Sequence, residues 1–113
     1  MSLIYKISTV DLWQIAEKTR VFEGAPIDFQ DGYIHFSSKD TVKETAAKHF
    51  AGQDDLLLVA IDEDDLPEGK LVWETSRGGA LFPHLYAPLS LDAVRWVKPL
   101  PLGADGQHIF PEL

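Results

Sequence analysis

The sequence has 113 residues and no cysteine, which suits a single domain over residues 1–113 with one hydrophobic core and excludes disulfides, thiolate catalysis and cysteine-based zinc sites. Its net charge is −8, and seven of its acids fall in residues 54–68, a stretch without Lys or Arg that we interpret as a solvated loop. This acidity argues against nucleic acid and anionic membranes as partners, because neutralising phosphates requires a basic face, and no apolar stretch approaches the roughly 20 residues of a membrane span.

The N-terminal part is predicted to hold a strand, a helix and a loop. Residues 3–7 are a short β-prone run. Ser8 or Thr9 can cap a helix that ends near Arg20, and side chains one helical turn apart predict its buried face. The members of that face are Leu12, Trp13, Ile15, Ala16 and Thr19. Residues 22–30 are expected to form an ordered loop.

The most informative stretch is Asp31-Gly-Tyr-Ile-His-Phe-Ser-Ser38. Gly32 suits a turn with positive φ, and a short strand should follow. Alternate side chains of a strand point to opposite faces, so its polar residues should face one way and its apolar residues should face the core. The polar set is Tyr33, His35 and Ser37, and the apolar pair is Ile34 and Phe36.

The rest of the chain is predicted to contain one helix and several strands. The helix covers residues 39–51, with Ser37 or Ser38 as N-cap and Gly52 near its C-terminal end. Its apolar face is Val42, Ala46, His49 and Phe50, and Glu44 pairs with Lys48. Strands are expected over residues 55–61 (central, covered on both faces), 70–74 and 91–97, the last with a turn of helix at 90–92. Helices early and strands late favour an α+β fold.

His35 is the sharpest candidate for a binding role. Its ring can donate and accept hydrogen bonds at once, which suits recognition of a ribose hydroxyl or an amide. Ser37 lies on the same predicted strand face, and the helix that follows would offer free N–H groups to a phosphate. The alternative is a half-buried histidine bonded to backbone, with Ser37 and Ser38 acting only as helix caps.

Glu74 ends an apolar strand, where a sheet edge can present a carboxylate to a cleft. A catalytic acid or a stabiliser of positive charge would belong there, although an exposed strand-end glutamate is the commoner outcome. His84 and Tyr86 stand two apart between Pro83 and Pro88, so in an extended segment they share a face. For His84 and Tyr86, a functional role and simple packing of an aromatic loop are the two alternative interpretations.

Phosphate and metal sites have weaker signals. Arg20 and Arg77 could pair with a phosphate, but isolated arginines are usually solvated. His49 is expected to pack as a structural residue. The four histidines have neither HExxH nor His-x-His spacing, so no metal site is predicted, and no dinucleotide, P-loop or hydrolase motif is present.

Two blocks of the sequence resemble a small family of bacterial and plant proteins of unknown function. They are Asp31-Gly-Tyr-Ile-His-Phe-Ser-Ser38 and Phe82-Pro-His-Leu-Tyr-Ala-Pro-Leu89. Family members carry Asp-Gly, an aromatic residue, Ile-His, an aliphatic residue and Ser, then a helix, an apolar strand, Trp-Glu and Phe-Pro-His-Leu-Tyr-Gly-Pro-Leu. The likeness covers nearly the whole chain. Phe36 and Ala87 depart from the pattern, and both departures leave the candidate side chains in place.

Members of that family are similar in fold to ADP-ribosyltransferases. The resemblance implies a split, strongly bent antiparallel β core with two main helices and a cleft for NAD. In those enzymes a histidine near the start of the core binds the NAD ribose and the nicotinamide amide, an aromatic stacks on nicotinamide, and a late glutamate promotes transfer. By this likeness His35, followed by Ser37, matches the first element, Tyr86 the stacking group and Glu74 the acid.

The leading hypothesis is a cytoplasmic, monomeric ADP-ribosyltransferase-like domain that binds NAD or a related small nucleotide. Its candidate ligand contacts are His35, Ser37, Ser38, His84 and Tyr86, and its candidate catalytic residues are His35 and Glu74. No tightly bound cofactor is expected, and NAD is the candidate substrate. A non-catalytic ligand-sensing module is the alternative, favoured because the late glutamate motif of the transferases is not evident. A structural domain would fit if the His and Tyr side chains are buried and internally satisfied.

Overall fold

The computed structural model of the chain describes residues 2–76 and 78–113. In these residues, three short helices and eight strands, all paired antiparallel, make an α+β fold, as predicted. The helices are α1 (Val10–Thr19), α2 (Pro26–Asp31) and α3 (Val42–His49), and single 3₁₀ turns cover Glu63–Asp65 and Leu91–Ala93. The strands are β1 (Leu3–Thr9), β2 (Val21–Phe22), β3 (Ile34–His35), β4 (Leu56–Asp62), β5 (Leu71–Thr75), β6 (Leu81–Leu85), β7 (Leu89–Ser90) and β8 (Val94–Pro99). No helix in the described part of the chain combines the length and apolar character needed to cross a membrane.

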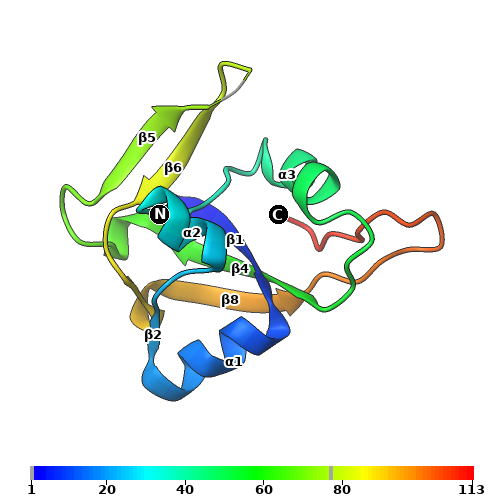
Figure 1. The fold of residues 1–113 in the computed structure, drawn as a ribbon, viewed down its shortest axis with the longest axis horizontal. Helices are drawn as coiled ribbons and strands as arrows, with labels where there is room; N and C mark the ends of the chain where they lie inside the picture. The colour runs from blue at the N-terminus through cyan, green and yellow to red at the C-terminus, as the bar shows by residue number, and fades with distance from the viewer. Residues whose placement is uncertain (1, 77) are drawn as a thin grey trace.

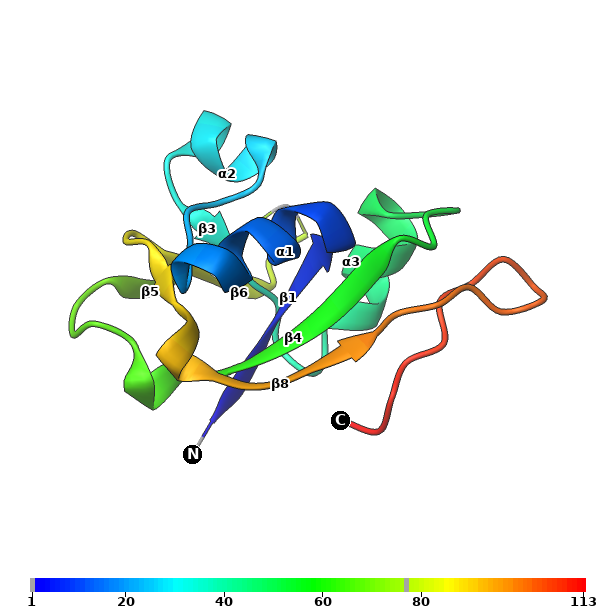
Figure 2. The ribbon, with the colours of Figure 1, turned by 90° about the horizontal axis from the view of Figure 1, so that it is seen from below.

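The central sheet has the strand order β1-β4-β8, with β4 in the middle (Figures 1 and 2). Successive side chains of β4 enter two different clusters. Val59 and Ile61 face a cluster that includes Trp13 of α1, whereas Leu58 and Ala60 face one that includes residues of α3. The prediction of a central strand covered on both faces is confirmed, and Figure 1 shows α1 and α3 on opposite sides of β4. The expected single core is instead divided in two by this sheet.

A second sheet, with the order β3-β6-β5, carries most of the candidate residues. Ile34 of β3 and Leu85 of β6 are opposite each other in register, and both are buried in the same cluster as Trp13. The other face of this sheet therefore points away from that cluster. The hairpin of β5 and β6 projects from the rest of the molecule in Figure 1.

Residues 22–30 were expected to form a loop, and that prediction is wrong. Phe22 belongs to β2, which pairs with β7, and α2 follows. Pro26 begins α2, where its missing N–H costs nothing, and Gly32 ends it with a φ of 87°, a left-handed value that glycine adopts without strain. The predicted pair of main helices is therefore a set of three short ones.

The predicted N-cap of the third helix is also wrong. The helix begins at Val42, and Thr41 is its N-cap residue. Ser37 does not cap it, because it lies five residues before Val42 and its side-chain hydroxyl donates to Thr45 Oγ1. Its backbone N–H and C=O are both bonded to Tyr5 of β1. Ser38 contributes its carbonyl, which accepts from the amides of Thr41 and Val42. The predicted pair of Glu44 and Lys48 is present, with a Glu44 Oε1 to Lys48 Nζ distance of 2.8 Å.

Three side chains expected to be buried are exposed. In α1, Ile15 and Thr19 face solvent, because the helix instead buries Trp13 and Ala16, and the indole packs 5.7 Å from the ring of Phe22. Burying the largest side chain sets the rotation of the helix. In α3, His49 lies exposed in the last turn, so its predicted structural packing is wrong.

The acidic stretch is more ordered than a solvated loop. Asp62 is buried, and its Oδ2 lies 2.8 Å from a guanidinium nitrogen of Arg95. The same nitrogen lies 2.8 Å from Asp65 Oδ2. One basic residue of β8 therefore holds the 3₁₀ turn after β4 against the neighbouring strand, and part of the acidic charge is compensated within the fold.

Candidate functional site

The candidate histidines are cross-strand neighbours. His35 of β3 lies directly opposite His84 of β6, and their ring centroids are 5.4 Å apart. Val72 of β5 is the partner of His84 on its other side, so Glu74, two residues along, lies on the same face as both histidines. Tyr33 and Tyr86 lie next to the ends of β3 and β6 on that face. We call this set, Tyr33, His35, Glu74, His84 and Tyr86, the polar face.

Tyr33 lies at the centre of the rings on the polar face. Its ring stacks on His84 with centroids 4.1 Å apart and an interplanar angle of 27°. The rings of His35 and Tyr86 lie 4.7 Å and 5.2 Å from it, both tilted. Tyr33 and His35 share one side as predicted, but Ser37, the third member of that predicted set, is buried and bonds Thr45 instead. The prediction that His84 and Tyr86 share one side is confirmed. Their meeting across two strands was not predictable from either block alone.

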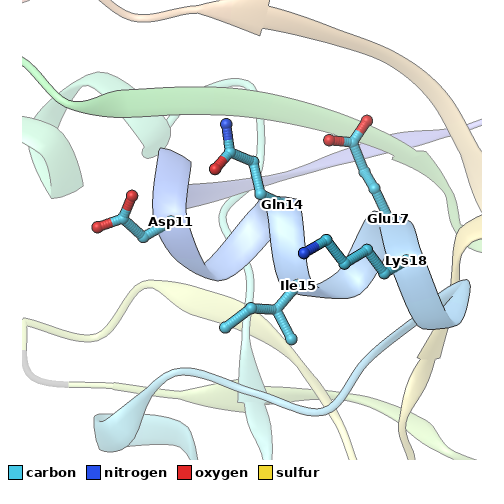
Figure 3. Close-up of a pocket in the computed structure, with 5 residues that line it drawn as sticks. All are labelled: Asp11, Gln14, Ile15, Glu17 and Lys18. Carbon is cyan, nitrogen blue, oxygen red and sulfur yellow. The ribbon is translucent and has the colours of Figure 1, made fainter.

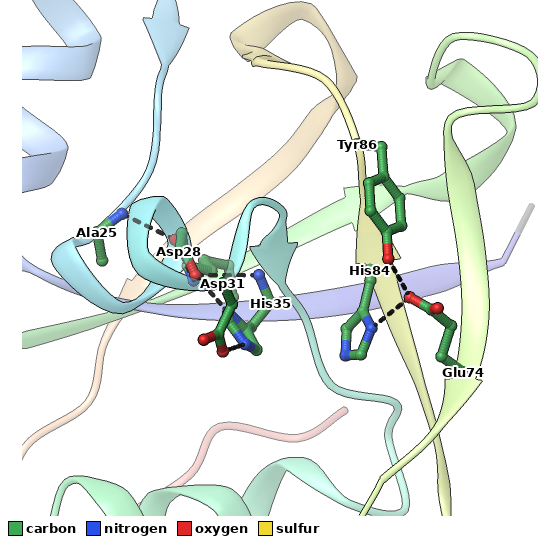
Figure 4. A network of polar contacts seen from close by, with 8 residues as sticks. Ala25, Asp28, Asp31, His35, Glu74, His84 and Tyr86 are labelled. Atoms are coloured by element: carbon green, nitrogen blue, oxygen red, sulfur yellow. Dashed lines mark hydrogen bonds and ion pairs between the residues drawn. The ribbon is translucent and has the colours of Figure 1, made fainter.

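His35 is held between two carboxylates, as Figure 4 shows. Its Nδ1 lies 2.6 Å from Asp28 Oδ1, and its Nε2 lies 2.9 Å from Asp31 Oδ2. Each ring nitrogen thus faces a carboxylate oxygen, and the two contacts fix the orientation of the imidazole. The His35 side chain is 31% exposed, and Asp31 lies on its solvent side. A ligand that bonds Nε2 would therefore displace Asp31.

Asp28 anchors this arrangement from the interior. Both of its oxygens accept from Lys6 Nζ, at 3.0 and 3.2 Å, and both side chains are buried. The backbone amides of Ala25 and His35 also donate to it, at 2.8 and 3.1 Å. Burial lowers the pKa of Lys6, which Asp28 opposes. This network joins β1, α2 and β3, and it fixes the position of the His35 ring.

The pKa of Asp28 predicts a dependence of stability on acid. Burial alone would raise this pKa, but the hydrogen bond from His35, the charge of Lys6 and the amide of Ala25 lower it from 3.8 to about 2. A carboxyl with a depressed pKa contributes stability that is complete above its unfolded-state pKa and is lost as the pH falls, here by about 2 kcal/mol between about pH 4 and pH 2. A ¹³C NMR titration of the Asp28 carboxyl should have its midpoint near pH 2, and a midpoint near pH 4 would contradict the network.

Glu74 joins the two residues of the second block (Figure 4). Its Oε1 accepts from Tyr86 Oη at 2.6 Å and from His84 Nδ1 at 2.8 Å. These two hydrogen bonds lower the pKa of Glu74. His84 is buried, whereas Tyr86 is 43% exposed. The polar face is thus partly satisfied internally and partly open to solvent.

The hydrogen bond to Glu74, with a smaller contribution from burial, raises the pKa of Tyr86 to about 12. Replacing Glu74 by glutamine removes the charged acceptor, so we expect the Tyr86 pKa in Glu74→Gln to fall toward the ordinary value of about 10. Titration of the tyrosine ¹³Cζ signals measures this directly. Tyr5, buried and distant in the central sheet, is the internal control whose titration should not change. Equal Tyr86 titration in wild type and variant would contradict the assigned bond.

A shallow hollow of about 280 Å³ adjoins the polar face, and Tyr33 and Tyr86 belong to both. We call it the aromatic hollow; its lining includes Glu23, Phe29, Gly32, Tyr33, Tyr86 and Pro88. His35 is not part of its lining. A larger depression, of about 640 Å³, lies over α1 and is lined only by Asp11, Gln14, Ile15, Glu17 and Lys18 (Figure 3). All five come from one helix, so it has a single wall, and no candidate residue lies there.

The remaining candidates lie away from the polar face. Ser37 is buried, and its Oγ bonds Thr45 Oγ1 at 3.1 Å. Ser38 bonds Thr41 Oγ1 at 3.0 Å. Arg20 forms an exposed ion pair with Asp92, and Arg77 lies outside the described residues. The structure therefore brings together His35, Glu74, His84 and Tyr86, but not the two serines.

Three residues of the site were not identified from the sequence: Lys6, Asp28 and Asp31. Lys6 interrupts an apolar strand, which is a signal for a buried cation that needs a carboxylate partner. Asp28 follows Pro26 by two residues, a favoured place for an acid in the first turn of a helix. Neither signal predicts the contact between Lys6 and Asp28, because 22 residues separate them in the sequence.

Within the described residues, no group of three or more His, Cys, Asp and Glu side chains could hold a metal ion.

A family model described as "Protein of unknown function (DUF952)" matches residues 7–97. The chain belongs to this family. The prediction of a family of unknown function is thereby confirmed, and the match covers the whole polar face.

Solved structures of one bacterial protein resemble this member of the family. The crystal structure of protein CC0527 from Caulobacter crescentus is 46% identical, with a TM-score of 0.90 over 96% of this chain and 94% of that one. Its solution NMR structure is 48% identical, with a TM-score of 0.84 over 95% and 91%. No curated protein is similar enough in sequence to count as a relative. Neither the family description nor the name of the Caulobacter protein includes an activity or a ligand.

Proposed function

We propose that the polar face binds NAD or a related nucleotide and that this chain acts as an ADP-ribosyltransferase-like domain. One observation carries the proposal: two histidines, two tyrosines and a glutamate, in or next to three strands, meet on one partly exposed face, with the Tyr33 ring 4.7 Å from His35 and 5.2 Å from Tyr86. Exposed aromatic rings offer a stacking surface to a planar base or nicotinamide, and His35 Nε2 can donate to a ribose hydroxyl once Asp31 moves away.

Transfer of ADP-ribose is the reaction that these residues would serve. The bond between the ribose C1′ and the nicotinamide nitrogen breaks, nicotinamide leaves with the bonding electrons, and a nucleophile adds to C1′. Positive charge develops on the ribose during this step, and the carboxylate of Glu74 would stabilise it. This choice of reaction rests on the likeness to ADP-ribosyltransferases that the sequence blocks led us to expect, and the position of Glu74 beside both His84 and Tyr86 is compatible with it.

A thermal-shift titration of the wild-type chain with NAD, ADP-ribose and nicotinamide tests ligand binding. A ligand that binds only the folded state raises the free energy of unfolding by about 2.7 kcal/mol at a concentration of 100 Kd. We expect NAD or ADP-ribose to raise the melting temperature in a saturable way. No shift with either nucleotide at millimolar concentration would refute the proposal. Release of nicotinamide from NAD by wild type, and its loss in Glu74→Gln, then separates catalysis from binding alone.

A further inference from the structure

The aromatic hollow has a chemistry of its own, distinct from that of a phosphate site. We propose that it binds a small organic cation, one whose positive nitrogen is surrounded by alkyl carbons. The inference does not depend on nucleotide binding, because it is carried by the lining of the hollow and not by His35.

The walls of the hollow are aromatic and open to solvent. Phe29 of α2 is 66% exposed and Tyr86 is 43% exposed, and both line the hollow together with Tyr33. Exposed aromatic groups at a concave site are more often binding surfaces than scattered apolar residues are. The faces of such rings attract a cation within about 6 Å of the centroid. Three rings around one hollow therefore favour a cation with an apolar surface.

The charged groups in the lining are acidic. No Lys or Arg of the described residues lines the hollow. Glu23 lies exposed at its edge and forms no ion pair with any described residue. Asp28 also borders the hollow, but Lys6 already neutralises it from the interior. Glu23 is thus the charge left to pair with a bound cation.

Further negative charge lies behind the tyrosine rings. Glu74 accepts the hydrogen of Tyr86 Oη at 2.6 Å, a charge-assisted bond that makes the ring richer in electrons. Burial, then the charges of Asp31 and Glu74, raise the pKa of Tyr33. The same negative field that disfavours a tyrosinate attracts a cation. His35 is not part of the lining, and its two ring nitrogens contact the carboxylates of Asp28 and Asp31.

The size of the hollow limits the ligand to a small one. Its volume of about 280 Å³ lies just below the range of about 300–1,000 Å³ that holds drug-sized ligands. An alkylated ammonium fits these dimensions, whereas a dinucleotide would extend beyond the hollow.

The test compares choline with 3,3-dimethylbutan-1-ol, its uncharged isostere in which carbon replaces nitrogen. In an NMR titration of the wild-type chain we expect choline to shift the signals of Phe29, Tyr33 and Tyr86 in a saturable way. The isostere should bind at least about five-fold more weakly, since it lacks the cation–π attraction. Equal affinity for the two probes, or no shift of these signals by choline, would overturn the proposal.

Matched variants locate the site. Phe29→Ala removes an exposed ring and should weaken choline binding without affecting folding, and Glu23→Gln should weaken it by removing charge alone. Ile27→Ala is the control, since Ile27 is 50% exposed on the same helix but lies outside the lining. An equal loss in Ile27→Ala, or no loss in Phe29→Ala, would overturn the assignment. If the chain binds choline but no nucleotide, only the nucleotide proposal is refuted. If it binds a nucleotide but not choline, only the proposal of a cation site in the aromatic hollow is refuted.

Discussion

Replacing Asp28 by alanine should lower the free energy of unfolding by about 3–5 kcal/mol, because it leaves the ammonium group of Lys6 buried without its carboxylate. The variant also loses the acceptor for two backbone amides and for the His35 ring. Domains of this size have a total stability of only about 5–15 kcal/mol, so Asp28→Ala will lie close to the limit of folding. Urea denaturation followed by circular dichroism measures the loss.

Asp92→Ala is the matched control for Asp28→Ala. Asp92 also pairs with a basic residue, Arg20, but both side chains are exposed. Exposed ion pairs contribute at most about 1 kcal/mol, so this variant should be nearly as stable as the wild type. The double variant Lys6→Met with Asp28→Leu should regain part of the loss, since it removes both buried charges. Equal stability of Asp28→Ala and Asp92→Ala would refute the role of Asp28 as the interior anchor.

Replacing His35 by alanine should weaken nucleotide binding roughly 2- to 10-fold, the effect of losing one hydrogen bond. The fold should survive, because the side chain is 31% exposed and Asp28 keeps its contacts with Lys6. Calorimetric titration with the nucleotide that shifts the wild type, together with the melting temperature of each variant, measures both effects.

His49→Ala is the control for His35→Ala, since His49 is an exposed histidine on α3. We expect its affinity and melting temperature to match the wild type. A large drop in the melting temperature of His35→Ala with unchanged nucleotide affinity would assign His35 to structure and not to binding.

The alternation of side chains along strands was readable in the sequence. It predicted correctly that Tyr33 and His35 share a face, that His84 and Tyr86 share a face, and that the run in β4 is covered on both sides. Its placement of Ser37 with Tyr33 and His35 was wrong. The pairing of β3 with β6 was not readable, because both segments are short and strand register is set by contacts between distant parts of the chain. The proximity of the two histidines depends on that register.

The helices were less predictable than the strands. The helix α2 has only six residues, too few for a periodic apolar pattern, although Pro26 at its start and Gly32 at its end were usable signals. In α1 the spacing alone could not choose between Ile15 and Trp13 as the centre of the buried face, and the contact of Trp13 with Phe22 decides it. The two serines were misplaced because the pairing of Ser37 with Tyr5 joins segments far apart in sequence.

The central claim is that the polar face of the β3-β6-β5 sheet is a ligand site. Its most direct test is an NMR titration of the wild-type chain with NAD and with ADP-ribose, followed residue by residue. The account predicts saturable shifts concentrated at Tyr33, His35, His84 and Tyr86, with none at the exposed residues of α1. Shifts confined to other parts of the chain, or no shifts with either nucleotide at millimolar concentration, would contradict it.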